Sequence, residues 1–337
     1  MNETPSNNNT ILQVENLKKY FPIRRGFFQR VSSWVRAVEN VSFMIKAGKT
    51  LGLVGESGCG KTTVARLILK LIEAEAGKIV FDGQDITDLN EPEMNPLRKE
   101  IQIIFQDPYG SLNPRMTVGQ SIAEGLKIAG IDNRPEMQQR LEKLFKMVGM
   151  SPSGIDRFPH EFSGGQRQRI GIARALSVEP ALIICDEPVS ALDVSIQAQI
   201  INLLKDLQEQ LNLSYLFISH DLNVVGYLCD MVAVMYKGHI MEHAPADELF
   251  DNPVHPYTHL LLSAIPDSVQ SPAINMNAIG DEPADTLNPP AGCSFQDRCP
   301  ISEDRCKQSD IDFETVSDDH LVRCWKTVKD GASQFFS

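Results

Sequence analysis

The apolar positions of this chain follow two patterns, short apolar-rich runs and longer stretches with helical spacing. The short runs predict strands at 11–15, 41–45, 50–55, 101–105, 181–185, 215–219 and 231–236. Helical spacing of the apolar residues marks 64–72, 196–211 and much of 116–180. Strands that alternate with helices predict an α/β fold, with a largely parallel sheet covered by helices on both faces.

The ends of the chain lack this regularity. Residues 1–10 are polar and predict a disordered lead, whereas 21–36 form a basic, aromatic segment between the first two predicted strands. Beyond about residue 265 the pattern gives way to Pro, Asp, Asn and Ser, followed by a cysteine-containing segment. We therefore expect one folded domain over 11–265 and an irregular C-terminal extension over 266–337.

Composition narrows the class of protein. The chain has 337 residues, of which 42% are hydrophobic and 23% charged, as in ordinary globular proteins. The formal net charge of −12 argues against a broad nucleic-acid interface. No apolar run approaches the ~18 residues of a membrane-spanning helix, and the polar N-terminus does not resemble a signal peptide. These features indicate a cytoplasmic chain, where disulfides seldom persist.

A glycine-rich stretch, GESGCGKT at 55–62, matches the G-x-x-x-x-G-K-[ST] phosphate loop between a predicted strand and a predicted helix. Glycines allow the backbone N–H groups to point at phosphate oxygens, Lys61 can reach the β- and γ-phosphates, and Thr62 can ligate Mg²⁺. A glycine turn with a chance lysine is the alternative, which this placement disfavours. The candidate nucleotide-binding residues are Gly55, Glu56, Ser57, Gly58, Cys59, Gly60, Lys61, Thr62 and Thr63.

Two acidic residues follow the predicted strand at 181–185. Asp186 is placed to hold a metal ion, and Glu187 is placed to polarise an attacking water molecule. Acidic residues after a strand often only cap a loop, so this pair gains its meaning from the phosphate loop.

The stretch FSGGQRQR at 162–169 resembles the LSGGQ signature of the ATP-binding subunits of ABC transporters, with Phe162 in place of the first Leu. The resemblance extends over 11–330. It implies a P-loop NTPase fold of the ABC type, with a mainly parallel core sheet, an antiparallel β part and a helical subdomain at about 107–165. It also implies that two subunits pack head to tail, so that ATP lies between the loop of one and the signature of the other. The signature residues in this chain are Ser163, Gly164, Gly165 and Gln166.

Other parts of the chain resemble the remaining motifs of this family. Gln106 resembles the Q-loop glutamine, Asp193 belongs to a D-loop-like SALD, and His220 resembles the switch histidine. Phe21 would stack on adenine, with Tyr20 as the alternative; either could instead serve only in packing. The resemblance thus implies that Glu187, His220 and Gln106 act in catalysis, and that Thr62, Gln106 and Asp186 bind Mg²⁺.

Three segments, at 21–36, 106–119 and 252–266, resemble the versions found in oligopeptide and dipeptide importers. That resemblance implies the second ATPase of a dipeptide-type transporter, usually called the F subunit, at the cytoplasmic face of the inner membrane. Its partners would be a second, homologous ATPase as a heterodimer, two transmembrane permease subunits and, indirectly, an extracytoplasmic peptide-binding protein. Other cargoes (a nickel chelate, haem or antimicrobial peptides) and a soluble ATP-switched regulator stay open as alternatives.

Four of the seven cysteines lie in the last 45 residues, separated by five, six and seventeen residues. Four thiolates suit Zn²⁺ or an iron–sulfur cluster, and the absence of a C-x-x-C pair weakens zinc. Some importers of the resembling group carry a [4Fe–4S] cluster here, so the resemblance implies one. Zinc or unliganded thiols remain alternatives, as do a structural and a redox-sensing role. The candidate ligands are Cys293, Cys299, Cys306 and Cys324.

Overall fold

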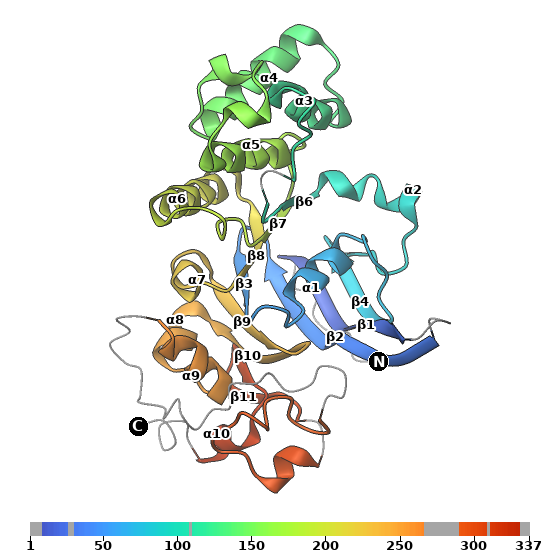
Figure 1. The fold of residues 1–337 in the computed structure, drawn as a ribbon, viewed down its shortest axis with the longest axis vertical. Helices are drawn as coiled ribbons and strands as arrows, with labels where there is room; N and C mark the ends of the chain where they lie inside the picture. Colours follow the sequence, from blue (N-terminus) through green and yellow to red (C-terminus); the bar gives the residue numbers. More distant parts are fainter. Residues whose placement is uncertain (1–8, 26–29, 108–109, 266–289, 309–310, 331–337) are drawn as a thin grey trace. The chain divides into compact units, whose positions relative to one another are not determined.

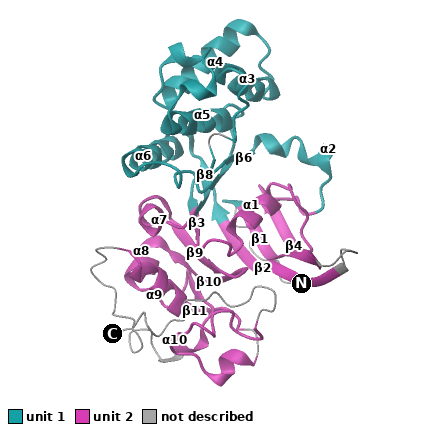
Figure 2. Cartoon of the chain, in the orientation of Figure 1, with its two compact units in different colours: residues 1–11, 45–50, 88–218 teal, residues 12–44, 51–87, 219–337 magenta. Residues whose placement is uncertain are grey.

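The computed structural model describes residues 9–25, 30–107, 110–265, 290–308 and 311–330 (Figure 1). The chain divides into two compact units that interleave along the sequence (Figure 2). Unit 1 comprises residues 1–11, 45–50 and 88–218, and unit 2 comprises 12–44, 51–87 and 219–337. The units are described in turn.

The sheet of unit 1 has parallel strands in the order β6–β7–β8. The strands are β6 (Ile101–Ile104), β7 (Leu182–Asp186) and β8 (Ser214–Ser219). Every residue of β7 and β8 is buried, as the continuous apolar runs predicted for a sheet covered on both faces. The parallel core is thus confirmed in this unit.

The helices of unit 1 follow the predicted helical spacing. They are α2 (Glu91–Met94), α3 (Val118–Ile128), α4 (Arg134–Met147), α5 (Gly164–Leu176) and α6 (Val194–Leu211). Helix α3 begins where the Thr117 side chain accepts a hydrogen bond from the Gln120 N–H and the Gln120 side chain returns one. The start of α3 is therefore determined by residues that are neighbours in the sequence.

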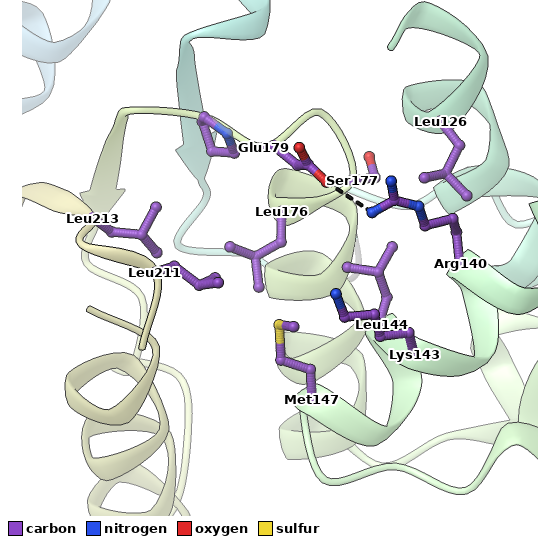
Figure 3. Close-up of a pocket in the computed structure, with 11 residues that line it drawn as sticks. Leu126, Arg140, Lys143, Leu144, Met147, Leu176, Ser177, Glu179, Leu211 and Leu213 are labelled. Atoms are coloured by element: carbon purple, nitrogen blue, oxygen red, sulfur yellow. Dashed lines mark hydrogen bonds and ion pairs between the residues drawn. The ribbon is translucent and has the colours of Figure 1, made fainter. Parts of the chain in front are cut away.

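A cavity of about 360 Å³ opens beside α4 in unit 1. Five leucines line it, including Leu126 and Leu144, and an ion pair joins the Arg140 guanidinium to the Glu179 carboxylate at 2.9 Å (Figure 3). None of the lining residues is a predicted site residue. The cavity is therefore separate from the motifs described above.

Unit 2 contains a four-stranded sheet in the order β2–β1–β4–β5. Its strands are β1 (Thr10–Arg25), β2 (Arg30–Lys46), β4 (Ala76–Phe81) and β5 (Gln84–Asp85). Strands β1 and β4 are antiparallel, with Leu12 opposite Phe81. The basic, aromatic segment at 21–36 thus lengthens two strands, apart from 26–29, which lie outside the described residues.

The second set of strands in unit 2 runs in the order β11–β12–β10–β9–β3, with β3 and β9 parallel and the other pairs antiparallel. The strands are β3 (Thr50–Val54), β9 (Met231–Tyr236), β10 (His239–Pro245), β11 (Glu314–Ser317) and β12 (His320–Val322). The helices are α1 (Lys61–Ile68), α7 (Leu222–Leu228), α8 (Ala246–Asp251), α9 (Pro256–Ser263) and α10 (Trp325–Asp330). Across the described part of the chain, no helix is both long and apolar enough to cross a bilayer.

The C-terminal extension is more regular than predicted. Strand β12 pairs with β10, so the expectation of an irregular tail was wrong for this part, although 266–289 lie outside the described residues. The contact is polar at its centre: the fully buried Glu242 carboxylate lies 2.8 Å from Nε2 of His320, whose Nδ1 lies 3.0 Å from Glu248. Burial alone would lower the pKa of His320, but these hydrogen bonds raise it.

Candidate nucleotide site

The phosphate loop connects β3 to α1, and its backbone requires glycine at two positions. Gly55 has φ +150° and Gly60 has φ +114°. A Cβ atom at Gly55 would lie 2.0 Å from the Met235 carbonyl oxygen, and one at Gly60 would lie 2.1 Å from that of Ala37. The loop is therefore wrapped closely against neighbouring backbone at both ends, as a loop that binds phosphate with its N–H groups requires.

The Lys61 ammonium group is held against the phosphate loop by hydrogen bonds to the loop's own backbone. The Lys61 side chain is buried, and Nζ donates hydrogen bonds to the carbonyl oxygens of Gly55 at 2.7 Å and Glu56 at 3.0 Å. Thr62 and Thr63 follow, half-buried, in the first turn of α1. An ammonium group beside a helix N-terminus favours an anion, so the residues present fit a nucleotide phosphate.

Two residues that the sequence did not identify hold the start of the loop. The hydroxyl of Tyr257, on α9, accepts a hydrogen bond of 2.9 Å from the Glu56 N–H. The Arg298 guanidinium, in the C-terminal extension, donates to both Glu56 carboxylate oxygens at 2.9 and 3.0 Å. Tyr257 lies within 252–266, which the sequence marked only by its resemblance to peptide importers. Arg298 carried no signal except its place beside Cys299.

In unit 1, Glu187 and Gln106 lie together. Gln106 Nε2 donates a hydrogen bond of 2.9 Å to the Glu187 carboxylate, and the Glu187 N–H donates to the Ile218 carbonyl oxygen at 3.0 Å. Glu187 has φ +48°, a conformation that costs a non-glycine residue about 1–2 kcal/mol. Asp186 precedes it at the end of β7 and is 8% exposed. The structure thus joins the predicted Q-loop amide to the predicted water-polarising carboxylate.

The signature is also in unit 1, at the start of α5. Ser163 Oγ accepts a hydrogen bond from the Gln166 N–H at 3.4 Å, and the Ser163 N–H donates to Gln166 Oε1 at 3.0 Å. A Cβ atom at Gly165 would lie 2.5 Å from Ile196 Cγ2, so α5 and α6 approach closely here. Asp193 is the N-cap residue of α6. Gly164 completes the motif at the first position of α5.

The two candidate adenine-stacking residues differ in their surroundings. The Tyr20 hydroxyl donates a 2.6 Å hydrogen bond to Glu39, and burial together with this partner raises the pKa of Tyr20 to about 12. Phe21 is 39% exposed, with Lys19 Nζ 5.5 Å from its ring centroid. His220 is exposed directly after β8. Phe21 is the more accessible aromatic ring of the two.

The four cysteines of the extension are free thiols that interact with one another. The Cys293 N–H donates to the Cys306 carbonyl oxygen at 2.8 Å. Burial raises the pKa of Cys293 and of Cys299 to about 12, and nearby cysteines, including Cys324, act in the same direction. Even so, among the described residues no three His, Cys, Asp or Glu side chains have the geometry of a metal site. Four thiols are suitable metal donors, but in this structure they are not arranged as ligands around a metal ion.

The fold, the phosphate loop and the signature define an ATP-binding cassette, and comparison with known proteins supports that class. Residues 38–190 match the family described as ABC transporter, and residues 241–306 match the oligopeptide/dipeptide transporter C-terminal region. Among solved structures, cbiO1 from Clostridium perfringens, part of the ABC transporter complex cbiONQ, has a TM-score of 0.63, 28% identity and coverage of 72% of this chain and 92% of that one. The ATP-binding cassette MJ0796 bound to ADP and Pi has a TM-score of 0.61, 26% identity and coverage of 70% and 98%.

Curated relatives are more similar. The oligopeptide transport ATP-binding protein AppF of Bacillus subtilis is 50% identical over 325 residues, 95% of this chain and 98% of that protein. The oligopeptide transport ATP-binding protein OppF of Salmonella typhimurium is 46% identical over 333 residues, 97% and 99%. The chain therefore belongs to the ABC transporter ATP-binding proteins of the oligopeptide/dipeptide transporter family, and it is an ABC-type ATPase.

Proposed function

We propose that this chain hydrolyses ATP to power the import of di- or oligopeptides through a membrane ABC transporter. Its relatives named as oligopeptide transport ATP-binding proteins match it over nearly their whole length, which supports this cargo class. In this proposal, residues 11–265 form the ATP-binding domain, with a helical subdomain at about 107–165, and 266–337 form the extension. The chain acts as the F subunit of a dipeptide-type transporter at the cytoplasmic face of the inner membrane, with a second homologous ATPase and two permease subunits.

In this proposal each motif acts on the nucleotide as the family resemblance implies. The backbone of Gly55–Thr63 and the Lys61 ammonium hold the phosphates, and Phe21 stacks on adenine. Thr62, Gln106 and Asp186 supply oxygen ligands for Mg²⁺, which neutralises charge on the phosphates when it is bound. The Ser163–Gln166 signature, followed by Asp193 in the D-loop, contacts the nucleotide held by the partner ATPase.

The observation that carries the hydrolytic assignment is the Gln106–Glu187 hydrogen bond at a strained backbone position. The Gln106 amide fixes the orientation of the Glu187 carboxylate, which positions and polarises the attacking water. His220 contacts the γ-phosphate, and closure of the ATPase pair around ATP moves the permeases between their two access states.

The variant Glu187→Gln tests this assignment. We expect turnover to fall by about 10²–10⁴-fold, since the amide cannot accept a proton, while ATP binding persists and the closed pair accumulates. ATPase rates and the population of nucleotide-bound pairs would be measured in the assembled transporter. Glu209→Gln, a matched change on the exposed face of α6, should retain wild-type rates. Rapid hydrolysis by Glu187→Gln would overturn the assignment.

For the extension we propose a four-thiolate site, with [4Fe–4S] ahead of zinc. The donor set supports it, as does the hydrogen bond that brings Cys293 and Cys306 together. Anaerobic purification should give a broad absorption band near ~400 nm, with about four irons and four sulfides per chain. Cys299→Ser should abolish both signals, while Cys229→Ser, a cysteine outside the extension, should not. One zinc per chain, or no metal, would refute the cluster.

A further inference from the structure

The Arg298 side chain, in the C-terminal extension, contacts the phosphate loop. Its guanidinium forms a two-pronged ion pair with Glu56, the second residue of the loop, and its side chain is only 12% exposed. It also lies 5.7 Å from the ring centroids of Tyr236 and Phe295. A bidentate, stacked arginine loses less freedom per hydrogen bond than an ordinary surface pair, so this contact holds a more definite geometry than such pairs.

An aromatic cluster supports the same point of the loop. The rings of Tyr236, Tyr257 and Phe295 are almost fully buried, with centroids 4.7, 5.2 and 5.4 Å apart. Tyr257 in turn accepts the hydrogen bond from the Glu56 N–H. Both the backbone and the side chain of Glu56 are therefore held by residues far away in sequence.

The turn that presents Arg298 is built on the cysteines. The Arg298 N–H donates to the Phe295 carbonyl oxygen at 3.1 Å, and the turn begins at Cys293 and ends at Cys299. A 2.8 Å hydrogen bond ties Cys293 to the Cys306 carbonyl oxygen. The position of Arg298 thus depends on how the cysteine segment is folded.

The charge of Glu56 gives this contact a consequence for nucleotide binding. A carboxylate at the start of a phosphate loop repels a polyphosphate, and this repulsion is strong at a partly buried site. Arg298 neutralises the carboxylate and keeps the loop in one conformation before ligand arrives, which lowers the entropy lost on binding. If the extension packed on another surface, it would neither neutralise Glu56 nor fix the conformation of the loop.

We propose that Arg298 is a positioning residue for nucleotide binding: through Glu56 it makes the affinity of the phosphate loop for ATP depend on the folded cysteine segment. This rests on the proposed role of Gly55–Thr63 in binding ATP. Because Arg298 acts on binding and not on hydrolysis, its loss raises KM while kcat at saturating ATP is unchanged.

A double-mutant cycle on the full chain tests the proposal, with the ATP dissociation constant as the readout. Arg298→Ala is expected to weaken ATP binding by about 10–100-fold, since it leaves Glu56 unpaired beside the phosphates. Glu56→Gln should weaken it less, and the double variant should recover most of the loss. Arg298→Lys, which keeps the charge but not the two-pronged geometry, should lie between wild type and Arg298→Ala.

Lys326→Ala is the matched control, because it removes a cation that pairs with Glu303 inside the extension. It should bind ATP as the wild type does. The inference would be overturned if folded Arg298→Ala or Arg298→Lys bound ATP with wild-type affinity. It would also be overturned if Lys326→Ala lost as much affinity as Arg298→Ala, or if Arg298→Ala lowered kcat and left KM unchanged. Lys61→Ala separates failure of the loop site from failure of the positioning role. If this variant still binds ATP, the proposed loop site is wrong. If it loses ATP binding while the Arg298 variants bind ATP normally, only the positioning role is refuted.

Discussion

The phosphate loop and the signature are both glycine-rich stretches at helix N-termini, but different forces hold them. Ser163 and Gln166 cap the signature helix within four residues. The loop has no side-chain cap at Gly60, and its conformation depends on Ala37, Met235, Tyr257 and Arg298, each at least 23 positions from Gly60. One element is specified locally and the other by the tertiary structure.

This difference determines what each element can sense. A locally capped helix start keeps its shape while the rest of the chain changes, which suits a surface that must fit a partner. A loop supported from a distance is sensitive to the state of its supports, here α9 and the C-terminal extension. Perturbations of those supports should therefore affect the loop and leave the signature intact.

The largest effect, a loss of folding stability, is expected when the pH is lowered. Burial lowers the pKa of His255, the N-cap residue of α9, to about 4, whereas the unfolded chain has the ordinary value near 6.5. The unfolded state then binds more protons between these values, so stability falls as the pH drops from about 6.5 to 4, by at most about 3 kcal/mol for this group. His320, whose pKa is raised, contributes fully below its unfolded pKa and so adds no slope in this window.

His255→Asn tests this expectation, because asparagine can still cap α9 but does not titrate. Denaturant unfolding followed by tryptophan fluorescence reports on unit 2, which contains both Trp34 and Trp325. The variant should lose less stability than the wild type on acidification. Identical pH profiles for the two chains would show that His255 is not the group involved.

A smaller effect is expected at Gly60, where a side chain would overlap the Ala37 carbonyl oxygen. Gly60→Ala should lower the free energy of unfolding by about 2 kcal/mol, since the left-handed strain of about 1–2 kcal/mol adds to a clash with backbone. Gly58→Ala is the matched control: φ is also positive, at +81°, but the new Cβ would have no neighbour within 4 Å. Thermal unfolding and ATP titration should rank the two variants in this order; equal losses would refute the steric argument.

The smallest effect is expected at the signature. Ser163→Ala removes the N-cap acceptor of α5 and should cost about 1 kcal/mol, while Ser163→Thr, which keeps a hydroxyl, should cost less. Circular dichroism during denaturant unfolding measures both. Because the cap is local, neither variant should change ATP binding to the loop in isolated chains. A loss of such binding would contradict the separation of the two elements.

Much of the fold could be predicted from the sequence because continuous apolar runs identify buried parallel strands. Strands β6, β7, β8 and β9 lie within a residue or two of their predicted positions. Strand β10 was not predicted, since its polar residues, Glu242 among them, are paired in ways that only the folded chain reveals. Short β11 and β12 carry too few apolar residues to give a periodic signal.

Part of the candidate site could likewise be predicted from the sequence, and part could not. The spacing of the GESGCGKT and SGGQ stretches identified the loop and the signature, because such motifs combine turn, cap and charge within a few residues. Tyr257 and Arg298 were missed as contacts of the loop, since nothing within α9 or the extension indicates what they face across more than two hundred residues of chain.

By itself, the sequence determined the class of this protein and its chemical groups: the phosphate loop, the acidic pair, the signature and four thiols in the extension. Only the tertiary structure decided which groups support one another, such as Gln106 with Glu187 and Arg298 with Glu56. The physical reason is that local motifs encode the hydrogen bonds of their own turns. Charge pairing and ring packing between distant segments depend on how the whole chain brings them together.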